Sequence, residues 1–376
     1  MDRTVHILVS GRREDTRMMK VMVVGASGVL GRLICMELLR IFNNQVTLIV
    51  TDYIEERGTR LAESIHREAI FRYLDATNEE NIRKTIQNVD IVIVAVNQQN
   101  PYIQRACIDH HILCIDVTPF PNFVEKVKRL HKDADKNDVG SVVMSGFFPG
   151  LSGLMVNKAV SSFQEVTEVN IGLLQNTNAK AGISGILDML KIISQPVHYD
   201  TGSDTANLAG FTKKRKMYFM EPSNESEVRL IDHAEKDCLK QKLNVEQINY
   251  WTSWNNRFFN KQISLLRRLR VIDHILKRNN KKFLSKVVKH NPNKNEHAFL
   301  TVEVKGIIDH RECIRTLSLS TFSDYHTTAM VTAGLAKVTV HKKIKGVVFP
   351  FEITDMNEIL SEINCKDIVL KEFITR

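Results

Sequence analysis

The sequence lacks the cysteine patterns of secreted or metal-binding proteins. Its six cysteines are scattered along 376 residues, with no CxxC pair and no regular spacing. Isolated thiols of this kind are typical of a reducing compartment, where they stay unpaired. We therefore expect a cytoplasmic protein without a disulfide framework. The histidines are scattered as well, so the sequence implies no metal site.

Several enzyme signatures are also missing. No apolar run approaches the ~20 residues of a membrane span, and we expect no secretory leader. The chain has no GxxxxGK[ST] phosphate loop, no HExxH helix and no GxSxG elbow. None of the seven tyrosines is followed four residues later by Lys, the pair that short-chain dehydrogenases require. These absences disfavour nucleoside triphosphatases, zinc proteases, hydrolases and short-chain dehydrogenases.

Positive charge is concentrated in one segment. Residues 256–294 contain twelve Lys or Arg against one acid, Asp273, so their net charge of +11 exceeds the +9 of the whole chain. Within this segment, residues 262–278 predict one amphipathic helix with a basic face. We favour a solvated basic face over an apolar stripe packed on the core. Binding of nucleic acid or an anionic surface is the less favoured alternative.

A glycine turn follows an apolar strand near the start of the chain. Val21–Val24 is apolar throughout, as expected for a strand buried on both faces, and a helical pattern begins at Leu30. Strand, glycine turn and helix follow in the order of a dinucleotide site, where unpaired N–H groups favour a phosphate. The predicted cofactor contacts in this turn are Gly25, Ala26, Ser27, Gly28, Val29, Leu30 and Gly31.

An acid ends the second predicted strand. Asp52 lies 21 residues after Gly31, close to the ~20 expected for a carboxylate that binds the adenosine ribose. Such an acid would repel a 2′-phosphate, which favours NAD over NADP. Arg57 and Arg60 lie just downstream and keep NADP open as the alternative. A plain turn residue at the strand end is the structural alternative for Asp52.

The alternation of strands and helices predicts two domains. Repeated βα units up to residue 150 indicate a Rossmann-type doubly wound parallel sheet. Longer alternating strands after about residue 165 indicate a second α+β domain on a mostly antiparallel sheet. We expect residues 1–17 to be a disordered extension, 18–150 the nucleotide domain and 151–334 the substrate and dimerisation domain.

Several stretches resemble the saccharopine dehydrogenase family of NAD(P)-dependent oxidoreductases. They include DIVIVAVN at 90–97, CIDVT at 114–118 and SGFFPGLS at 145–152. Further matches are VRLID at 228–232, YWTSW at 250–254 and DYHTTA at 324–329. The resemblance therefore extends from about residue 20 to 350.

The resemblance implies a nicotinamide cofactor, a substrate cleft between the domains and a C-terminal segment, 335–376, that returns to the nucleotide domain. It implies hydride transfer at a carbon–nitrogen bond of an amino-acid-derived or other small substrate, in a homodimer. Val96 and Asn97 would contact the cofactor. The implied substrate contacts are Gln98, Gly146, Phe147 and Phe148. Phe147 and Phe148 replace more polar residues, which argues against a doubly charged substrate.

Residue chemistry alone suggests two further roles. Asp116 ends a predicted strand at the ligand edge of the sheet and is our first choice for proton transfer, with a strand-end cap as the alternative. Tyr102 and His110 are expected to be structural. Arg215 is a candidate clamp for a substrate carboxylate, although a solvated loop charge is equally compatible. The alternative function is a non-catalytic NAD(P) sensor that binds a partner through helix 262–278.

Overall fold

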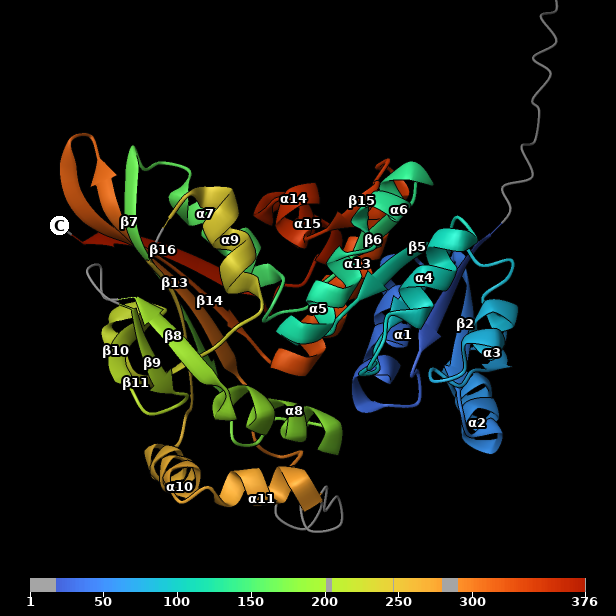
Figure 1. The fold of residues 1–376 in the computed structure, drawn as a ribbon, viewed down its shortest axis with the longest axis horizontal. Helices are drawn as coiled ribbons and strands as arrows, with labels where there is room; N and C mark the ends of the chain where they lie inside the picture. The colour runs from blue at the N-terminus through green and yellow to red at the C-terminus, as the bar shows by residue number, and fades with distance from the viewer. Residues whose placement is uncertain (1–17, 201–204, 246, 279–289, 376) are drawn as a thin grey trace, which may run out of the picture.

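The protein consists of two seven-stranded sheets with helices around and between them. The computed structural model describes residues 18–200, 205–245, 247–278 and 290–375. In Figure 1 the nucleotide-binding sheet lies on the right and the second sheet on the left. Helices α8 (Ile183–Ser194), α10 (Arg257–Arg268) and α11 (Val271–Arg278) lie below the second sheet in this view.

The nucleotide-binding sheet is parallel throughout, which confirms the predicted Rossmann-type fold. Its strand order is β15 (Gly346–Val348), β6 (Gly140–Val142), β5 (Leu113–Asp116), β4 (Ile91–Val94), β1 (Met19–Val24), β2 (Val46–Asp52) and β3 (Ile70–Tyr73). Its helices are α1 (Val29–Ile41), α2 (Glu55–Ile65), α3 (Glu79–Thr85), α4 (Tyr102–Asp109), α5 (Pro121–Lys128) and α6 (His131–Lys136).

Strand β1 shows why its sequence is apolar at successive positions. Val21 and Val23 pack in one hydrophobic cluster with Ile34 of α1, and Met22 packs in another with Ile103 of α4. Because consecutive side chains point to opposite faces, both faces of the strand are covered by helices. The unbroken apolar run therefore follows from the doubly wound arrangement.

The second sheet is mixed, with one parallel pair among antiparallel ones. Its order is β10 (Lys214–Phe219), β11 (Glu221–Ile231), β12 (Gln247–Trp254), β7 (Glu165–Gln175), β13 (Ala298–Ile308), β14 (Arg311–Thr321) and β16 (Val369–Thr375). Strands β8 (Pro196–Asp200) and β9 (Thr205–Ala209) form a separate hairpin. The mostly antiparallel second domain predicted from the sequence is thus confirmed.

The C-terminal segment contributes one strand to each sheet. Strand β15 extends the nucleotide-binding sheet beside β6, whereas β16 pairs with β14 at the edge of the second sheet. Helix α13 (Asp324–Val340) packs against α1 of the nucleotide domain, so the expected boundary at residue 334 falls inside a helix. The remaining helices are α7 (Leu151–Val160), α9 (Glu235–Leu243), α14 (Pro350–Ile353) and α15 (Met356–Ile363).

The expected single helix over residues 262–278 is wrong. Helix α10 ends at Arg268, and Arg270 has a left-handed backbone with φ of 57° before α11 begins at Val271. Neither Gly nor Pro lies at this break, so no local residue pattern predicts that the helix ends there. The predicted face is also less solvated than expected, because Arg267 donates a hydrogen bond to the Ser194 carbonyl oxygen over 2.6 Å.

Three further findings concern the described part of the chain. No helix there is long and apolar enough to cross a membrane. All six cysteines are present as free thiols, and five of them are buried. The same residues bring together no group of three or more His, Cys, Asp or Glu that would hold a metal ion.

Candidate active site

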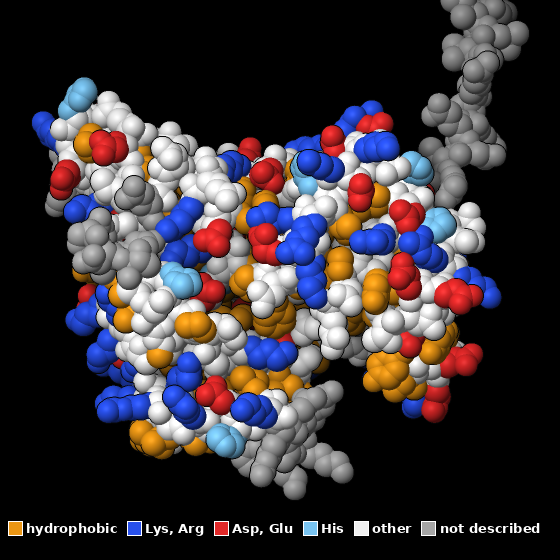
Figure 2. All heavy atoms as spheres, in the orientation of Figure 1, with side chains coloured by type: hydrophobic (Ala, Val, Ile, Leu, Met, Phe, Trp, Pro, Cys, Tyr) orange, Lys and Arg blue, Asp and Glu red, His pale blue; other side chains and the backbone are white. Residues whose placement is uncertain are grey.

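One cavity of about 1460 Å³ runs from the glycine turn of the nucleotide domain to α10 and α11 of the second domain. Its walls come from the ends of β1, β2 and β4, from α8, and from the start of α13. Figure 2 shows hydrophobic side chains gathered in the hollow between the two parts of the molecule. The cavity therefore joins a nucleotide-type site to an apolar compartment.

The glycine turn has the backbone that a dinucleotide site needs. Gly25 has a left-handed φ of 81°, and a Cβ on Gly31 would lie 2.2 Å from the Gly25 carbonyl oxygen. Gly28 begins α1 as its N-cap, and a Cβ placed there would come no closer than 3.3 Å to another atom. Gly25 thus permits the turn, Gly31 the close helix contact, and Gly28 an open approach for phosphate.

Asp52 lines the same end of the cavity as the glycine turn and is paired with Arg57. The guanidinium donates two hydrogen bonds of 2.7 Å to the two carboxylate oxygens, and the Ile54 N–H donates one of 2.8 Å. Burial opposes the charge of Asp52, but the bonds from Arg57 and Ile54 outweigh it and lower the pKa. Asp52 is therefore an ionised acceptor, with a cation beside it that can face a 2′-phosphate.

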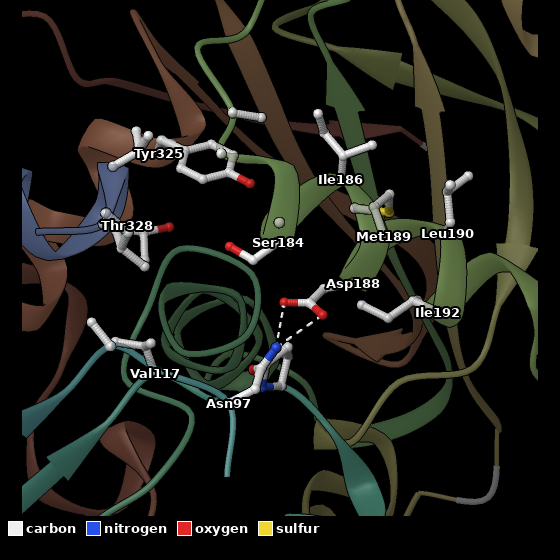
Figure 3. Close-up of a pocket in the computed structure, with 18 of the residues that line it drawn as sticks. Asn97, Val117, Ser184, Ile186, Asp188, Met189, Leu190, Ile192, Tyr325 and Thr328 are labelled. Atoms are coloured by element: carbon white, nitrogen blue, oxygen red, sulfur yellow. Dashed lines mark hydrogen bonds between the residues drawn. The ribbon is translucent and has the colours of Figure 1, made fainter. Parts of the chain in front are cut away.

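Asn97 and Asp188 meet in the middle of the cavity (Figure 3). Asn97 follows β4 and donates from Nδ2 to both oxygens of Asp188 on α8, over 3.0 and 2.8 Å. Burial raises the pKa of Asp188 above its ordinary value, although Asn97 and Lys191 counteract part of this effect. A carboxylate with a raised pKa in a cleft is a candidate for accepting and releasing a proton.

The start of α13 forms the wall opposite the apolar residues of α8 in Figure 3. Tyr325 packs so closely on α8 that a Cβ at Gly185 would lie 1.6 Å from its hydroxyl oxygen. Burial, followed by the carboxylates of Asp324 and Asp188, raises the pKa of the Tyr325 hydroxyl. Tyr325 is thus a neutral hydrogen-bond donor and acceptor beside Asp188.

Asp116 lies outside the cavity wall. Its carboxylate accepts hydrogen bonds from the Thr118 N–H over 2.6 Å, from Gln104 Nε2 over 2.5 Å and from Gln98 Nε2 over 3.2 Å. Burial raises the pKa of Asp116 to about 6, against these hydrogen bonds. Its partners all lie within the nucleotide domain, so the geometry favours the strand-end alternative over direct proton transfer to a substrate.

The other predicted site residues divide clearly. Eleven line the cavity: Gly25, Ser27, Gly28, Val29, Leu30, Gly31, Asp52, Val96, Asn97, Phe147 and Phe148. Four others do not: Ala26, Gln98, Gly146 and Arg215. Ala26 is fully buried in a hydrophobic cluster of the nucleotide domain, and Arg215 on β10 pairs with Glu303 over 2.5 Å. Asp188, Ser184 and Tyr325 are among the polar lining residues that the sequence analysis did not predict.

The loop carrying Phe147 and Phe148 is held by a buried acid of the second domain. Glu235 accepts hydrogen bonds from the Gly150 N–H over 3.1 Å, the Ser152 hydroxyl over 2.5 Å and the Tyr250 hydroxyl over 2.8 Å. Burial raises the pKa of Glu235 to about 7 despite these donors. This network fixes the apolar loop at the cavity wall.

Comparison with known proteins agrees with this architecture. Residues 21–142 match the family model described as the saccharopine dehydrogenase NADP binding domain. By this match, residues 21–142 are similar to the NADP-binding domain of the saccharopine dehydrogenase family. The match supports a nicotinamide cofactor for this domain. A search of curated proteins found no match.

One solved structure shares the overall fold of this chain. Apo saccharopine dehydrogenase (L-Glu forming) from Saccharomyces cerevisiae aligns with a TM-score of 0.69 and 14% identity, over 95% of this chain and 100% of that chain. DAP dehydrogenase of C. glutamicum in complex with DAP aligns with a TM-score of 0.47 and 11% identity, over 93% and 99% of the chains. An engineered D-amino acid dehydrogenase bound to NADP⁺ aligns with a TM-score of 0.49 and 10% identity, over 92% of this chain and 99% of that chain.

Proposed function

We propose that the protein is an NAD(P)-dependent oxidoreductase that transfers hydride at a carbon–nitrogen bond of a small substrate. The observation that carries this proposal is the continuity of the cavity, in which the glycine turn, Asp52 and the Asn97–Asp188 pair line one space. The Gly28 face leaves room for the pyrophosphate, and Asp52 has acceptors for ribose hydroxyls. These residues therefore fit a dinucleotide.

Asp188 is the proton acceptor in this proposal. A nicotinamide held beside Val96 and Asn97 would supply the acceptor for the hydride of the substrate C–H bond. The substrate nitrogen loses its proton to the Asp188 carboxylate, and a C=N bond forms. Asn97 holds both oxygens of Asp188, and Tyr325 can donate a hydrogen bond to the substrate from the α13 side. Asp116 acts one layer away as a positioning residue for the loop that begins at Val117.

NAD and NADP use the Asp52–Arg57 pair differently. An unmodified ribose hydrogen-bonds Asp52 while Arg57 stays in place, whereas a 2′-phosphate requires Arg57 to leave Asp52 and bind the phosphate. Since a bidentate pair of 2.7 Å bonds must break for NADP, we propose a modest preference for NAD. A homodimer and a cytoplasmic location remain expectations from the sequence.

The experiment is a turnover screen with both cofactors. The protein is incubated with NAD or NADP and a panel of amino acids and alkyl amines, and reduced nicotinamide is followed by absorbance. The proposal expects amine-dependent reduction with at least one panel member. Cofactor binding without any turnover would contradict it and favour the alternative of a non-catalytic NAD(P) sensor.

A further inference from the structure

The cavity extends well beyond the space around Asn97 and Asp188 into an apolar compartment. This compartment lies between α8, α10 and α11, and its wall is closed by β7 and the end of β12. Its apolar lining comprises Leu173, Ile186, Met189, Leu190, Ile192, Trp254, Phe259, Ile263, Leu266, Ile272 and Ile275. A pocket of this composition is suited to an apolar group rather than to a second polar head.

Helix α8 explains how the compartment is formed. It is apolar on two sides: Leu187 and Ile193 are buried in the core, whereas Ile186, Met189 and Ile192 are only partly buried and line the cavity. In Figure 3 the labelled apolar side chains of α8 lie on the side opposite Tyr325 and Thr328. One helix therefore carries both the carboxylate and part of the apolar wall.

The charge of the lining restricts the head group. Among the residues that the structure describes, Arg57 is the one Lys or Arg in the cavity wall, and it is held by Asp52 at the ribose end. Asp188 and Asp324 are the acids near the second domain. Lys191 lies 3.5 Å from Asp188 Oδ1 but does not line the cavity, so a substrate carboxylate would face Asp188 and Asp324 at a high desolvation cost. An amine would instead meet the Asp188 carboxylate.

From this arrangement we infer that the substrate is an amine with an extended apolar chain. Its nitrogen lies at Asp188 and its chain fills the compartment between α8, α10 and α11. This inference rests on the proposed function, but it predicts binding that is measured without turnover. It also excludes dicarboxylic amino acids as good ligands of this cavity.

The test is a binding series with n-alkylamines, from n-butylamine to n-decylamine, added to the full chain. Binding is followed by the fluorescence of the two tryptophans, of which Trp254 lines the compartment, and is repeated by calorimetry. Each added methylene should tighten binding by about fourfold while the chain still finds apolar wall. Decanoate should bind at least tenfold more weakly than n-decylamine. Equal affinities along the series, or tighter binding of decanoate, would overturn the inference.

Two variants test where the alkyl chain of the amine binds. Met189→Gln and Leu266→Gln keep the side-chain size but place an amide in the compartment. Each variant should bind n-decylamine about fivefold or more weakly than the parent, whereas its affinity for n-butylamine should be unchanged. Lys261→Gln is the matched control on α10, because Lys261 is exposed and does not line the cavity. Unchanged n-decylamine binding in both compartment variants would overturn the assignment.

The outcomes separate this inference from the proposed function. Amine binding that depends on chain length, without reduction of NAD or NADP, would support the compartment and contradict the enzyme. Turnover of short polar amino acids with no binding of long amines would support the enzyme and contradict the apolar substrate. In both cases thermal unfolding of the variants shows that they remain folded.

Discussion

Replacing Asp188 by Asn separates proton transfer from substrate positioning. The variant keeps one oxygen that can accept the hydrogen bond from Asn97 Nδ2, which now reaches both oxygens over 3.0 and 2.8 Å. It loses the charge and therefore the proton acceptor. We expect turnover to fall by about two orders of magnitude, equivalent to about 2.7 kcal/mol of transition-state free energy.

The effect on stability should be small in comparison. Burial already disfavours the charge of Asp188, as its raised pKa indicates, so a neutral amide removes a desolvation cost along with a hydrogen bond. We expect the free energy of unfolding to change by less than about 1 kcal/mol. Cofactor affinity should stay within a factor of two of the parent, because Asp188 lies beyond the glycine turn.

The assay is NAD reduction with n-decylamine, measured as kcat and KM across pH, beside thermal unfolding. In the parent, turnover should rise with pH as Asp188 loses its proton, and this rise should disappear in Asp188→Asn. Asp116→Asn is the matched comparison, because it disturbs the hydrogen bonds from Thr118 and Gln104. This variant should lower the melting temperature and leave kcat much less affected than in Asp188→Asn. Normal turnover in Asp188→Asn, or a hundredfold loss in a folded Asp116→Asn, would refute this reasoning.

Three other perturbations test the scaffold. Gly31→Ala places a Cβ 2.2 Å from the Gly25 carbonyl oxygen and should destabilise the fold by about 1–3 kcal/mol. Gly28→Ala places its Cβ 3.3 Å from the same oxygen, so it should lower the melting temperature less than Gly31→Ala does, and it should weaken NAD binding. Equal stability of the two variants in thermal unfolding would contradict the assignment. Asp52→Ser should reduce the preference for NAD over NADP in calorimetric titrations, and tighter NADP binding by the parent would contradict the role given to Asp52. Glu235 has a pKa of about 7 in the folded state against an ordinary 4.5, so its contribution to the free energy of unfolding is fully present below pH 4.5 and is lost as the pH rises through 7. The loss amounts to up to about 3 kcal/mol. Glu235→Gln should reduce the difference in stability between pH 5 and pH 8 in denaturant unfolding, and an unchanged difference would disprove this role.

The sequence predicted the parts of the site that depend on local backbone geometry. The glycine turn and Asp52 are found because one strand, one turn and one helix place them, and their spacing appears directly in the chain. The doubly wound sheet follows from the same local alternation. For these elements, tertiary contacts agree with the local pattern.

The substrate end of the site could not be predicted in this way. Asp188 belongs to α8, which no local motif marks, and it reaches Asn97 only because the second domain packs beside the nucleotide domain. Asp116 ends β5 and Asn97 follows β4 at the same sheet edge. The Asp116 carboxylate accepts a hydrogen bond from Gln104, whereas Asn97 lines the cavity. Arg215 pairs with Glu303 across the second sheet, a contact 88 residues apart in the chain. Strand-end position identified the edge of the sheet, whereas side-chain direction depended on packing.

A crystal structure of the protein with NADH and n-decylamine would test the central claim most directly. We predict the pyrophosphate at the Gly25–Gly31 turn, the nicotinamide beside Asn97 and the amine nitrogen in contact with the Asp188 carboxylate. The alkyl chain should lie against Met189 and Leu266. A nicotinamide away from Asn97, or an amine bound outside the cavity, would contradict the account.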